Sequence, residues 1–316
     1  MSIELRVAAG TVTYGNRSVY LYQNIDKLLV EGFDHIYVLL NGVSTAVVLE
    51  AKKRYAGRPV VFIKSERNVG SSGGFCKLLK YIHKFDRCER LLLLDDDNLV
   101  PDNFLLESRE ICQQSDDIFY FHRPDRNIPL ETFLAKDPRK ILGSDCNFLG
   151  RTVFLKQMDK NDYKGDLLAA PYGGLFLPRS ALEKEIFPDQ NFFLYADDYD
   201  YTFRLCSEGN FNIFFIRDQE IIDLEKSFHL RHKGFGFFKN RYYLASEQQL
   251  FFSVRNQIYL SLRQASSPAK FFVNLTFFAP IYLMQFFINL KFKKGSIFLK
   301  AVVKGARWAM IERIRN

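Results

Sequence analysis

Residues 91–101 read LLLLDDDNLVP, so four leucines are followed at once by three aspartates. A short run of leucines is typical of a strand that is buried on both faces of a sheet. Adjacent carboxylates repel one another, so three of them here indicate either a bound ligand or a solvated turn that caps a helix. We expect Asp95 and Asp97 to lie on the same side of an extended backbone. Two carboxylates placed in this way can share one Mg²⁺ ion with the phosphates of a substrate.

The first hundred residues alternate between apolar runs and helical patterns. HIYVLL (35–40) and PVVFI (59–63) are typical of buried strands, whereas Phe75, Leu78 and Ile82 have the spacing of one helix face. Strands that alternate with helices pair in parallel, with the helices on the faces of the sheet. The predicted fold class is therefore α/β with a mostly parallel sheet.

Four predicted strands end in polar or glycine-rich sequences. These are TYGNR (13–17), NGVS (41–44), ERNVGSSGGF (66–75) and DDDN (95–98). Because ligands of open parallel sheets bind beyond the carboxyl ends of the strands, we expect one binding edge here. The glycines after the third strand would let the backbone approach an anion at a helix start, although a tight turn is the alternative.

Two later segments carry candidate chemical groups. The segment NFFLYADDYDYTFRLCSEG (191–209) runs from a strand-like piece into a helix, and YADDYDY (195–201) within it places aspartates at the start of that helix. Helix starts favour carboxylates, and the aromatic surroundings would raise a carboxyl pKa, as a general base requires. In HLRHKGFG (229–236), His229 and His232 are candidates for a metal contact, with surface histidines as the alternative.

The charge of the chain is concentrated at its end. From Lys270 onward there are nine Lys or Arg residues and one acid, Glu312, which accounts for the whole net charge of +8. The neutral remainder argues against a nucleic-acid partner. The five cysteines form no CxxC pair and no N-terminal signal is visible, so we expect free thiols and a cytoplasmic protein.

Residues 271–290 form an uncharged run that reaches the length of a membrane span. However, this run is not uniformly apolar, because one stripe of the helix carries the polar residues Lys270, Asn274, Gln285 and Asn289. In the next segment, Lys293, Lys300, Lys304 and Arg307 share a face. We expect two helices that lie on the anionic inner face of the plasma membrane. A packed helical subdomain, a homo-oligomer interface and a spanning helix are the alternatives. The predicted division is a catalytic domain at 1–236 and a helical region at 237–316.

The chain contains a series of motifs in a fixed order: VTYGNR, NGVS, NVGSSGGF, DDDN, YGGLFLP, FFLYADDYDYTFRL, a downstream His and SVRN (253–256). With this set the chain resembles the family 2 glycosyltransferases of the GT-A fold over roughly residues 5–260. It looks most like the bacterial galactofuranosyltransferases and their rhamnosyltransferase relatives. Gly-x-x-Gly-Gly-Phe at 70–75 and Asp-Asp-x-Asp-Tyr at 197–201 are more similar to the galactofuranosyl branch.

The resemblance implies a role for each matching residue. Asp198 would be the catalytic base, and Asp95, Asp97 and His232 would hold Mg²⁺ or Mn²⁺. The residues that would bind the nucleotide-sugar are Thr13, Tyr14, Arg17, Asn41, Asn68, Gly70, Gly73, Gly74 and Asp96. The residues that would face the acceptor are Tyr172, Gly173, Gly174 and Asp197. Gly15 is an insertion relative to the usual Thr-Tyr-Asn-Arg run of the family.

The activity implied is inverting transfer of galactofuranose from UDP-galactofuranose to a lipid-linked polysaccharide such as O-antigen. A dTDP-rhamnose-dependent enzyme or another family 2 hexosyltransferase is the first alternative. A nucleotidyltransferase would need a basic glycine-rich loop after the first strand, where this chain has TYGNR. A non-catalytic sugar-binding protein would not need both acidic clusters.

Overall fold

A computed structural model describes residues 5–112, 115–124, 147–151, 153–154, 164–225, 240, 242–263, 265 and 267–315. The chain forms two compact units. The first comprises residues 1–134, 163–193 and 197–226, and the second comprises residues 135–162, 194–196 and 227–316. The predicted boundary between residues 236 and 237 falls outside the described residues and stays a prediction.

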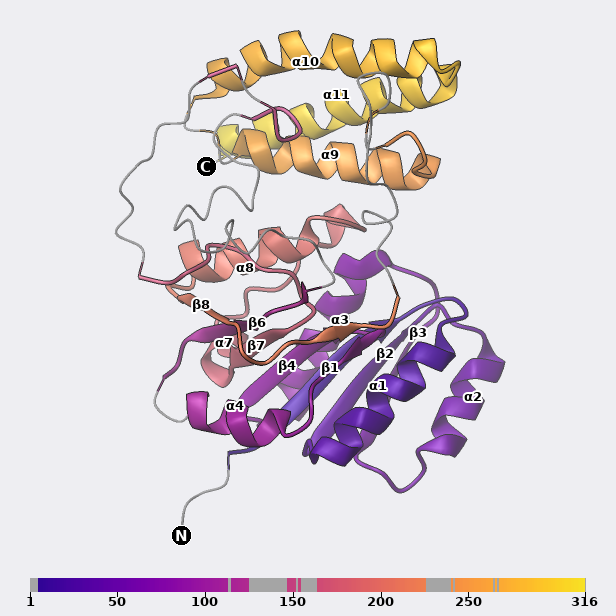
Figure 1. Cartoon of the computed structure of the whole chain (residues 1–316), viewed down its shortest axis with the longest axis vertical. Coiled ribbons are helices and arrows are strands. Elements are labelled where there is room, and N and C mark those ends of the chain that lie inside the picture. Colours follow the sequence, from indigo (N-terminus) through magenta and orange to yellow (C-terminus); the bar gives the residue numbers. More distant parts are fainter. Residues whose placement is uncertain are drawn as a thin grey trace. The chain divides into compact units, whose positions relative to one another are not determined.

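The first unit begins with the predicted alternation of strands and helices (Figure 1). Its elements in chain order are β1 (Val7–Thr13), α1 (Ser18–Glu31), β2 (His35–Asn41), α2 (Thr45–Arg54), β3 (Val60–Ser65), α3 (Gly70–Phe85) and β4 (Arg90–Asp95). β1 pairs in parallel with both β2 and β4, and β2 pairs in parallel with β3. The strands β1 and β4 are buried along almost their whole length, which explains their continuous apolar sequences.

The sheet continues beyond β4 with three more strands, β6 (Ile118–Phe121), β7 (Leu175–Pro178) and β8 (Ile213–Ile216). The strand order is β3-β2-β1-β4-β7-β6-β8. Only β7 among these strands of the described chain runs against the others, because it is antiparallel to both β4 and β6. The predicted mostly parallel sheet is therefore confirmed.

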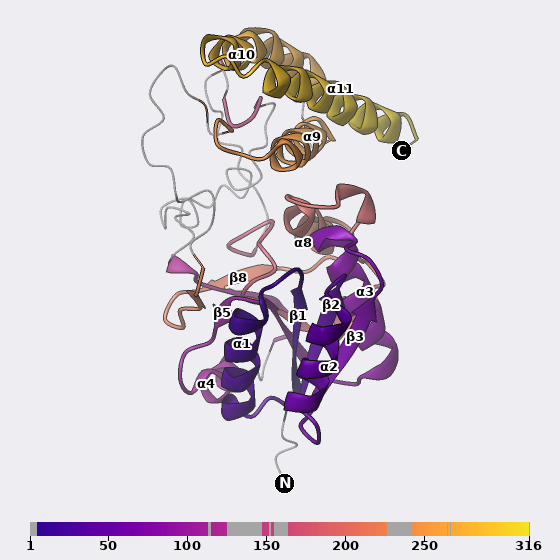
Figure 2. The same ribbon diagram turned by 90° about the vertical axis from the view of Figure 1, so that its right-hand side faces the viewer.

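Helices cover both faces of this sheet. The chain moves outward through β1, β2 and β3, so right-handed connections place α1 and α2 on one face, and α3, which returns to β4, on the other. Figure 2 shows α1 and α3 on opposite sides of the strands. The core on the α1 side includes Leu21, Ile25, Val48 and Leu92. On the other face, α3 approaches β1 so closely that a Cβ on Gly10 would lie 3.2 Å from a methyl carbon of Leu78.

The carboxyl ends of the first four strands meet at one edge, as predicted from the sequence. Thr13, Asn41, Ser65 and Asp95 are the last residues of β1, β2, β3 and β4. The strand order reverses between β1 and β4, so this is the topological switch point at which open sheets bind ligands. The sequence TYGNR lies at the end of β1 and DDDN at the end of β4, so they lie on the two sides of this switch point.

The prediction of a strand-like piece before the second acidic segment is wrong. Residues Gln190–Phe192 form a short 3₁₀ helix. Phe193, Tyr195 and Ala196 then have φ values of 62°, 68° and 62°, and backbone in this left-handed region cannot continue a strand. The helix predicted after it is present as α8 (Asp197–Ser207), and a short helix, α7 (Arg179–Glu183), follows β7.

The described part of the second unit is mostly helical from Glu247 onward, which confirms the predicted C-terminal helices. It contains α9 (Glu247–Arg263), α10 (Pro268–Ile288) and α11 (Phe292–Arg315), drawn from orange to yellow in Figure 1. α9 and α11 pack closely, because a Cβ on Gly305 would lie 2.3 Å from the carbonyl oxygen of Arg255. The rings of Tyr259 and Trp308 stack at 3.7 Å in the same contact.

Candidate active site

The three aspartates after the leucines do not form an extended segment. β4 ends at Asp95, and Asp96 and Asp97 form a turn before the short strand β5 (Asn98–Leu99). The expectation that alternation would place Asp95 and Asp97 on one side therefore rests on the wrong backbone geometry. The two carboxylates are nevertheless close enough to interact, because burial first and the charge of Asp95 second raise the pKa of Asp97 to about 6.

Arg17 holds one side of this acidic cluster. It follows β1, and its Nε atom donates to the two Asp96 carboxylate oxygens at 2.9 and 3.0 Å. The Thr13 hydroxyl donates to Asp96 Oδ2 at 2.7 Å. Arg17 also pairs with Asp97, at 3.3 Å, and with Glu225. The predicted residues Thr13, Arg17, Asp96 and Asp97 are thus brought together.

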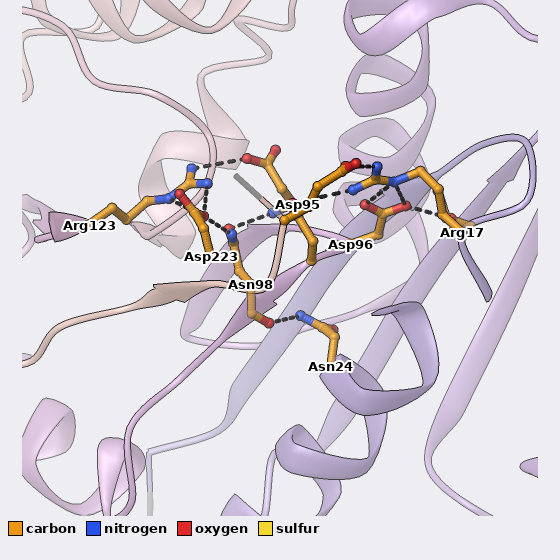
Figure 3. Close-up of polar contacts among 10 residues, drawn as sticks. Arg17, Asn24, Asp95, Asp96, Asn98, Arg123 and Asp223 are labelled. Atoms are coloured by element: carbon orange, nitrogen blue, oxygen red, sulfur yellow. Dashed lines mark hydrogen bonds and ion pairs between the residues drawn. The ribbon is translucent and has the colours of Figure 1, made fainter. Parts of the chain in front are cut away.

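Arg123 holds the other side, and sequence reasoning missed it. Figure 3 shows Arg17 and Arg123 approaching the aspartates from opposite sides. Arg123 follows β6, its side chain is fully buried, and its Nη1 atom donates to Asp95 Oδ2 at 2.9 Å. Its Nε atom donates to Asp223 at 3.0 Å. A local signal of the same kind as for DDDN was present, because Arg123 lies two residues after the apolar run IFYF (118–121), at the carboxyl end of a strand.

Asp223 reaches the cluster through a second, small sheet. β9 (Ile222–Asp223) pairs antiparallel with β5. Asn98 ties the two strands to the aspartates, since its side-chain oxygen accepts from the backbone N–H of Asp95 at 2.9 Å and its amide donates to Asp223 at 2.6 Å. The Asn24 side chain donates to the carbonyl of Asn98 at 2.6 Å, which fixes this turn to α1 (Figure 3).

The cluster is acidic despite its two arginines. Among the described residues, five carboxylates meet two guanidinium groups in these ion pairs: Asp95, Asp96, Asp97, Asp223 and Glu225. Burial raises the pKa of Asp96 to about 7, although Arg17 and Thr13 oppose this shift. The Asp95 and Glu225 side chains are 31% and 35% exposed, so these are the carboxylates of the cluster that a ligand can reach from solvent.

The carboxylates of the cluster can hold a divalent cation only if other groups, such as phosphate oxygens or water, supply its remaining ligands. No three His, Cys, Asp or Glu side chains are grouped to hold a metal within the part of the chain that the structure describes. Asp95 and Asp97 provide two interacting carboxylates, which is the number that Mg²⁺ commonly takes from a protein when phosphates and water complete its shell. The predicted third ligand, His232, and its alternative His229 lie outside the described residues.

The glycine-rich loop is built around Asn41. Its Nδ2 atom donates to the carbonyl of Gly70 at 2.9 Å, and its Oδ1 atom accepts from the N–H of Val69 at 2.9 Å. Asn68 accepts from the N–H of Gly70 at 2.8 Å. Gly70 has φ +77°, and a Cβ there would lie 1.9 Å from the carbonyl oxygen of Phe193. The hydrogen bonds of Asn41 and Asn68 therefore determine the backbone conformation of the loop, and their role in nucleotide-sugar binding stays a prediction.

Three other predicted nucleotide-sugar residues have different surroundings. A Cβ on Gly73 would meet Val69, and one on Gly74 would lie 2.7 Å from a methyl carbon of Val12, so packing alone requires small residues there. Tyr14 is 51% exposed, and its ring lies against the Arg17 guanidinium at 5.5 Å.

The predicted acceptor residues Tyr172 and Asp197 lie together and are buried. The Tyr172 ring stacks on Phe75 of α3 at 4.0 Å. Asp197 is 2% exposed, and burial followed by the charge of Asp198 raises its pKa well above the usual range. Hydroxyl groups of Ser71 and Tyr172 act on the Asp197 pKa in the opposite direction. Burial therefore favours the protonated form of Asp197 next to Asp198.

Asp198 occupies the first turn of α8 and is partly exposed. Its Oδ1 atom accepts from the N–H of Tyr199 at 2.9 Å. The helix is anchored nearby, because the Thr202 hydroxyl accepts from the N–H of Ala170 at 2.9 Å. The third acid, Asp200, is explained by an ion pair with Arg204 at 2.8 Å inside the same helix.

Gly173 joins the acidic cluster to the Tyr172 region. Its carbonyl accepts from Arg123 at 3.4 Å. A Cβ on Gly173 would lie 2.0 Å from Arg123 Nη1 and 2.5 Å from Asn98 Oδ1, so only glycine fits. Gly174 has φ +93° and a close contact with the carbonyl of Phe121. Both glycines are thus required by the local structure, and their acceptor role stays a prediction.

The SVRN motif has a structural role inside the second unit. Asn256, which is completely buried, donates from its Nδ2 atom to the carbonyls of Leu194 and Tyr195 at 2.8 Å each. These residues belong to the left-handed segment that directly precedes Asp197 in the chain. The hydrogen bonds compensate for the strain of positive φ at non-glycine residues.

No protein-family model matches the chain, and no curated protein matches its sequence. Solved structures do match. A mannosyltransferase from Pyrobaculum calidifontis, PcManGT in complex with GDP-Man and Mn²⁺, is 12% identical, with a TM-score of 0.53 over 97% of this chain and 76% of that one. TarS 1-349 from S. aureus in complex with UDP-GlcNAc is 12% identical, with a TM-score of 0.52 over 96% and 82%. At this identity the likeness concerns the fold alone, and the chain has the predicted GT-A fold with C-terminal helices.

Proposed function

We propose that this chain is a glycosyltransferase that moves a sugar from a nucleoside diphosphate donor to an acceptor hydroxyl. One observation carries the proposal. The switch point of the GT-A sheet carries an acidic cluster that is paired with two arginines, and one of these, Arg123, donates to the carbonyl of Gly173. The residue before Gly173, Tyr172, lies beside the buried Asp197, which is followed by Asp198. The PcManGT and TarS structures, which share the fold, hold GDP-Man and UDP-GlcNAc.

The acidic cluster is the proposed place of the donor diphosphate. Asp95 and Asp97 would hold Mg²⁺ or Mn²⁺, which when bound neutralises the charge that builds up on the departing diphosphate. Arg17 and Arg123 orient these carboxylates through their ion pairs. Since the partly exposed Asp95 is fixed by both Arg123 and the Asn98 turn, little reorganisation is needed when the donor binds.

Asp198 is the proposed general base of an inverting reaction. It takes the proton of the acceptor hydroxyl, whose oxygen attacks the anomeric carbon from the side opposite the diphosphate. Burial and the charge of the neighbouring Asp198 raise the pKa of Asp197, which favours its protonated form. Asp198 is partly exposed, so it is the carboxyl of the two that an acceptor can reach as a base.

The more specific proposal is galactofuranose from UDP-galactofuranose, with a lipid-linked polysaccharide such as O-antigen as acceptor. It is supported by the sequence patterns at 70–75 and 197–201. Rhamnose from dTDP-rhamnose is the alternative within the same class. Both donors present a diphosphate to the acidic cluster, so the nucleotide and sugar must be identified experimentally.

The test is a donor panel of UDP-galactofuranose, dTDP-rhamnose, GDP-mannose and UDP-GlcNAc, with release of nucleoside diphosphate as the readout. One donor should be consumed with Mn²⁺ and not after EDTA. Asp198→Asn should lower its rate by about 10²–10⁴-fold, the usual contribution of general base catalysis. Residual activity within about tenfold, roughly 1.4 kcal/mol, would exclude Asp198 as the base. Pyrophosphate release from a nucleoside triphosphate would instead indicate nucleotidyl transfer.

A further inference from the structure

Helix α10 buries two polar side chains together with apolar ones, and it also exposes large apolar side chains. Its polar residues Asn274 and Gln285 are 0% and 4% exposed. Asn274 accepts a hydrogen bond from the backbone N–H of Val153 at 2.8 Å, inside the second unit. Apart from Lys270 in its first turn, the exposed large side chains of the helix are apolar: Phe272, Val273, Phe277, Met284, Phe287 and Ile288.

The exposed apolar surface continues past the end of α10. Leu290, in the turn to α11, is 75% exposed, and Phe292, the first residue of α11, is 56% exposed. Lys291 and Lys293 alternate with them and are exposed as well. We call these four residues and the exposed apolar side chains of α10 the outer face. Water-exposed apolar patches of this kind mark interaction sites, because covering them is favourable.

Helix α11 adds positive charge beside exposed apolar groups. Its inward residues Phe298, Ala301 and Ala309 are completely buried. Its outward side combines basic and apolar residues, all exposed: Lys300, Lys304, Arg307, Leu299, Val303, Met310 and Ile314. A basic strip along an apolar strip is the pattern of helices that lie in a lipid headgroup region.

We propose that the outer face and the basic side of α11 dock on the surface of an anionic lipid bilayer. Charge complementarity selects this occupant, since the segment from Lys270 onward has nine basic residues and one acid. Each basic residue near such a surface contributes attraction that salt screens. Two copies of the same basic surface would repel each other, which argues against a second chain as the occupant.

The helix lies on the membrane and does not cross it. By length and composition alone, Pro268–Ile288 could cross a membrane, with a mean hydropathy of 1.7. However, Tyr282 and Phe286 are buried and their rings lie 5.4 and 5.9 Å from that of Phe298 in α11. A spanning α10 would have to lose these contacts and expose Asn274 and Gln285 to lipid.

The test is flotation of the full chain with vesicles of phosphatidylcholine alone and of phosphatidylcholine with phosphatidylglycerol. Wild type should float with the anionic vesicles at low salt, and binding should fall at least about tenfold in high salt. Phe277→Gln/Phe287→Gln and Lys300→Glu/Lys304→Glu should each lower binding by about tenfold or more. The matched controls Leu49→Gln and Lys52→Glu/Lys53→Glu alter exposed residues of α2 and should bind as wild type does.

Circular dichroism and thermal unfolding of each variant separate loss of binding from loss of folding. The proposal is overturned if wild type does not float, if it floats equally at both salt concentrations, or if both outer variants bind as the wild type does. Resistance to alkaline carbonate extraction would show a spanning helix instead. A wild-type dimer in light scattering that Phe277→Gln/Phe287→Gln converts to a monomer would assign the face to a second chain.

Discussion

The acidic cluster and helix α10 both reverse the usual distribution of side chains. In the cluster, Asp96, Asp97 and Arg123 are charged and are at most 6% exposed. In α10, Phe277 and Ile288 are apolar and are 60% and 52% exposed. Folding alone favours neither arrangement, because buried charges and exposed apolar groups both cost free energy. The two regions differ in how this cost is offset. The charged groups of the cluster form ion pairs with one another inside the protein, whereas the outer face can be covered only by another molecule.

The largest effect is expected from removing a cation from the cluster. Arg123→Ala leaves Asp95 and Asp223 without their shared guanidinium in a buried site. Breaking a buried ion pair by removing one partner costs about 3–5 kcal/mol of unfolding free energy. Urea unfolding should show this loss, whereas Arg58→Ala at an exposed position should change stability by less than about 0.5 kcal/mol. Equal stability of the two variants would contradict the pairing.

A smaller effect is expected when Arg123 is displaced and not removed. Gly173→Ala places a methyl group 2.0 Å from Arg123 Nη1. Overpacking of this kind costs about 1–3 kcal/mol, and the shifted arginine should also weaken donor binding. The control is Gly295→Ala in α11, where the nearest atom lies 3.7 Å away and helix propensity should make alanine neutral or stabilising. If both alanines stabilise the chain, the close approach of Gly173 and Arg123 is wrong.

Asp197 allows a test through pH. Its pKa in the folded chain is raised well above the value of about 4 expected in the unfolded chain. The folded state therefore binds more protons above pH 4, and stability must fall as pH rises from there through the folded-state pKa. Asp197→Asn removes this loss, so its advantage over wild type in urea unfolding should be greater at pH 8 than at pH 5. An advantage independent of pH would mean that Asp197 is ionised when buried.

The smallest effect is expected on the outer face. Phe287→Gln should change the free energy of unfolding by less than about 0.5 kcal/mol, because Phe287 is half exposed. Its neighbour Phe286 is 1% exposed, and Phe286→Ala should cost about 3–5 kcal/mol. Thermal unfolding of the two variants measures this difference in stability, since only the buried Phe286 ring contributes to the stability of the folded chain. Similar losses for both would place Phe287 inside the protein.

The four strand ends were predictable because the signals are local. Each of TYGNR, NGVS, NVGSSGGF and DDDN directly follows an apolar run, and parallel pairing alone brings their ends to one edge. Arg123 was missed because the short apolar run IFYF before it was not predicted as a strand of the sheet. Asp223 was missed because its position depends on the β5–β9 pair, which joins residues far apart in the sequence and has no periodicity that reveals it.

Two errors of prediction have physical causes as well. Helical periodicity correctly placed Asn274 and Gln285 on one stripe, but it does not tell which stripe faces inward, and here the polar one does. The start of the segment 191–209 was predicted to be strand-like. Left-handed φ values at Phe193, Tyr195 and Ala196 exclude a strand, and the hydrogen bonds of Asn256 to Leu194 and Tyr195 come from a helix about 60 residues away.

The central claim is that the acidic cluster binds a nucleoside diphosphate together with a divalent cation. Isothermal titration of UDP and GDP into the full chain, with Mn²⁺ and with EDTA, tests it most directly. One nucleotide should bind with Mn²⁺ and lose at least about tenfold in affinity with EDTA, and Asp95→Asn should show the weak binding under both conditions. Binding that is equal with Mn²⁺ and EDTA, and unchanged in Asp95→Asn, would contradict the account.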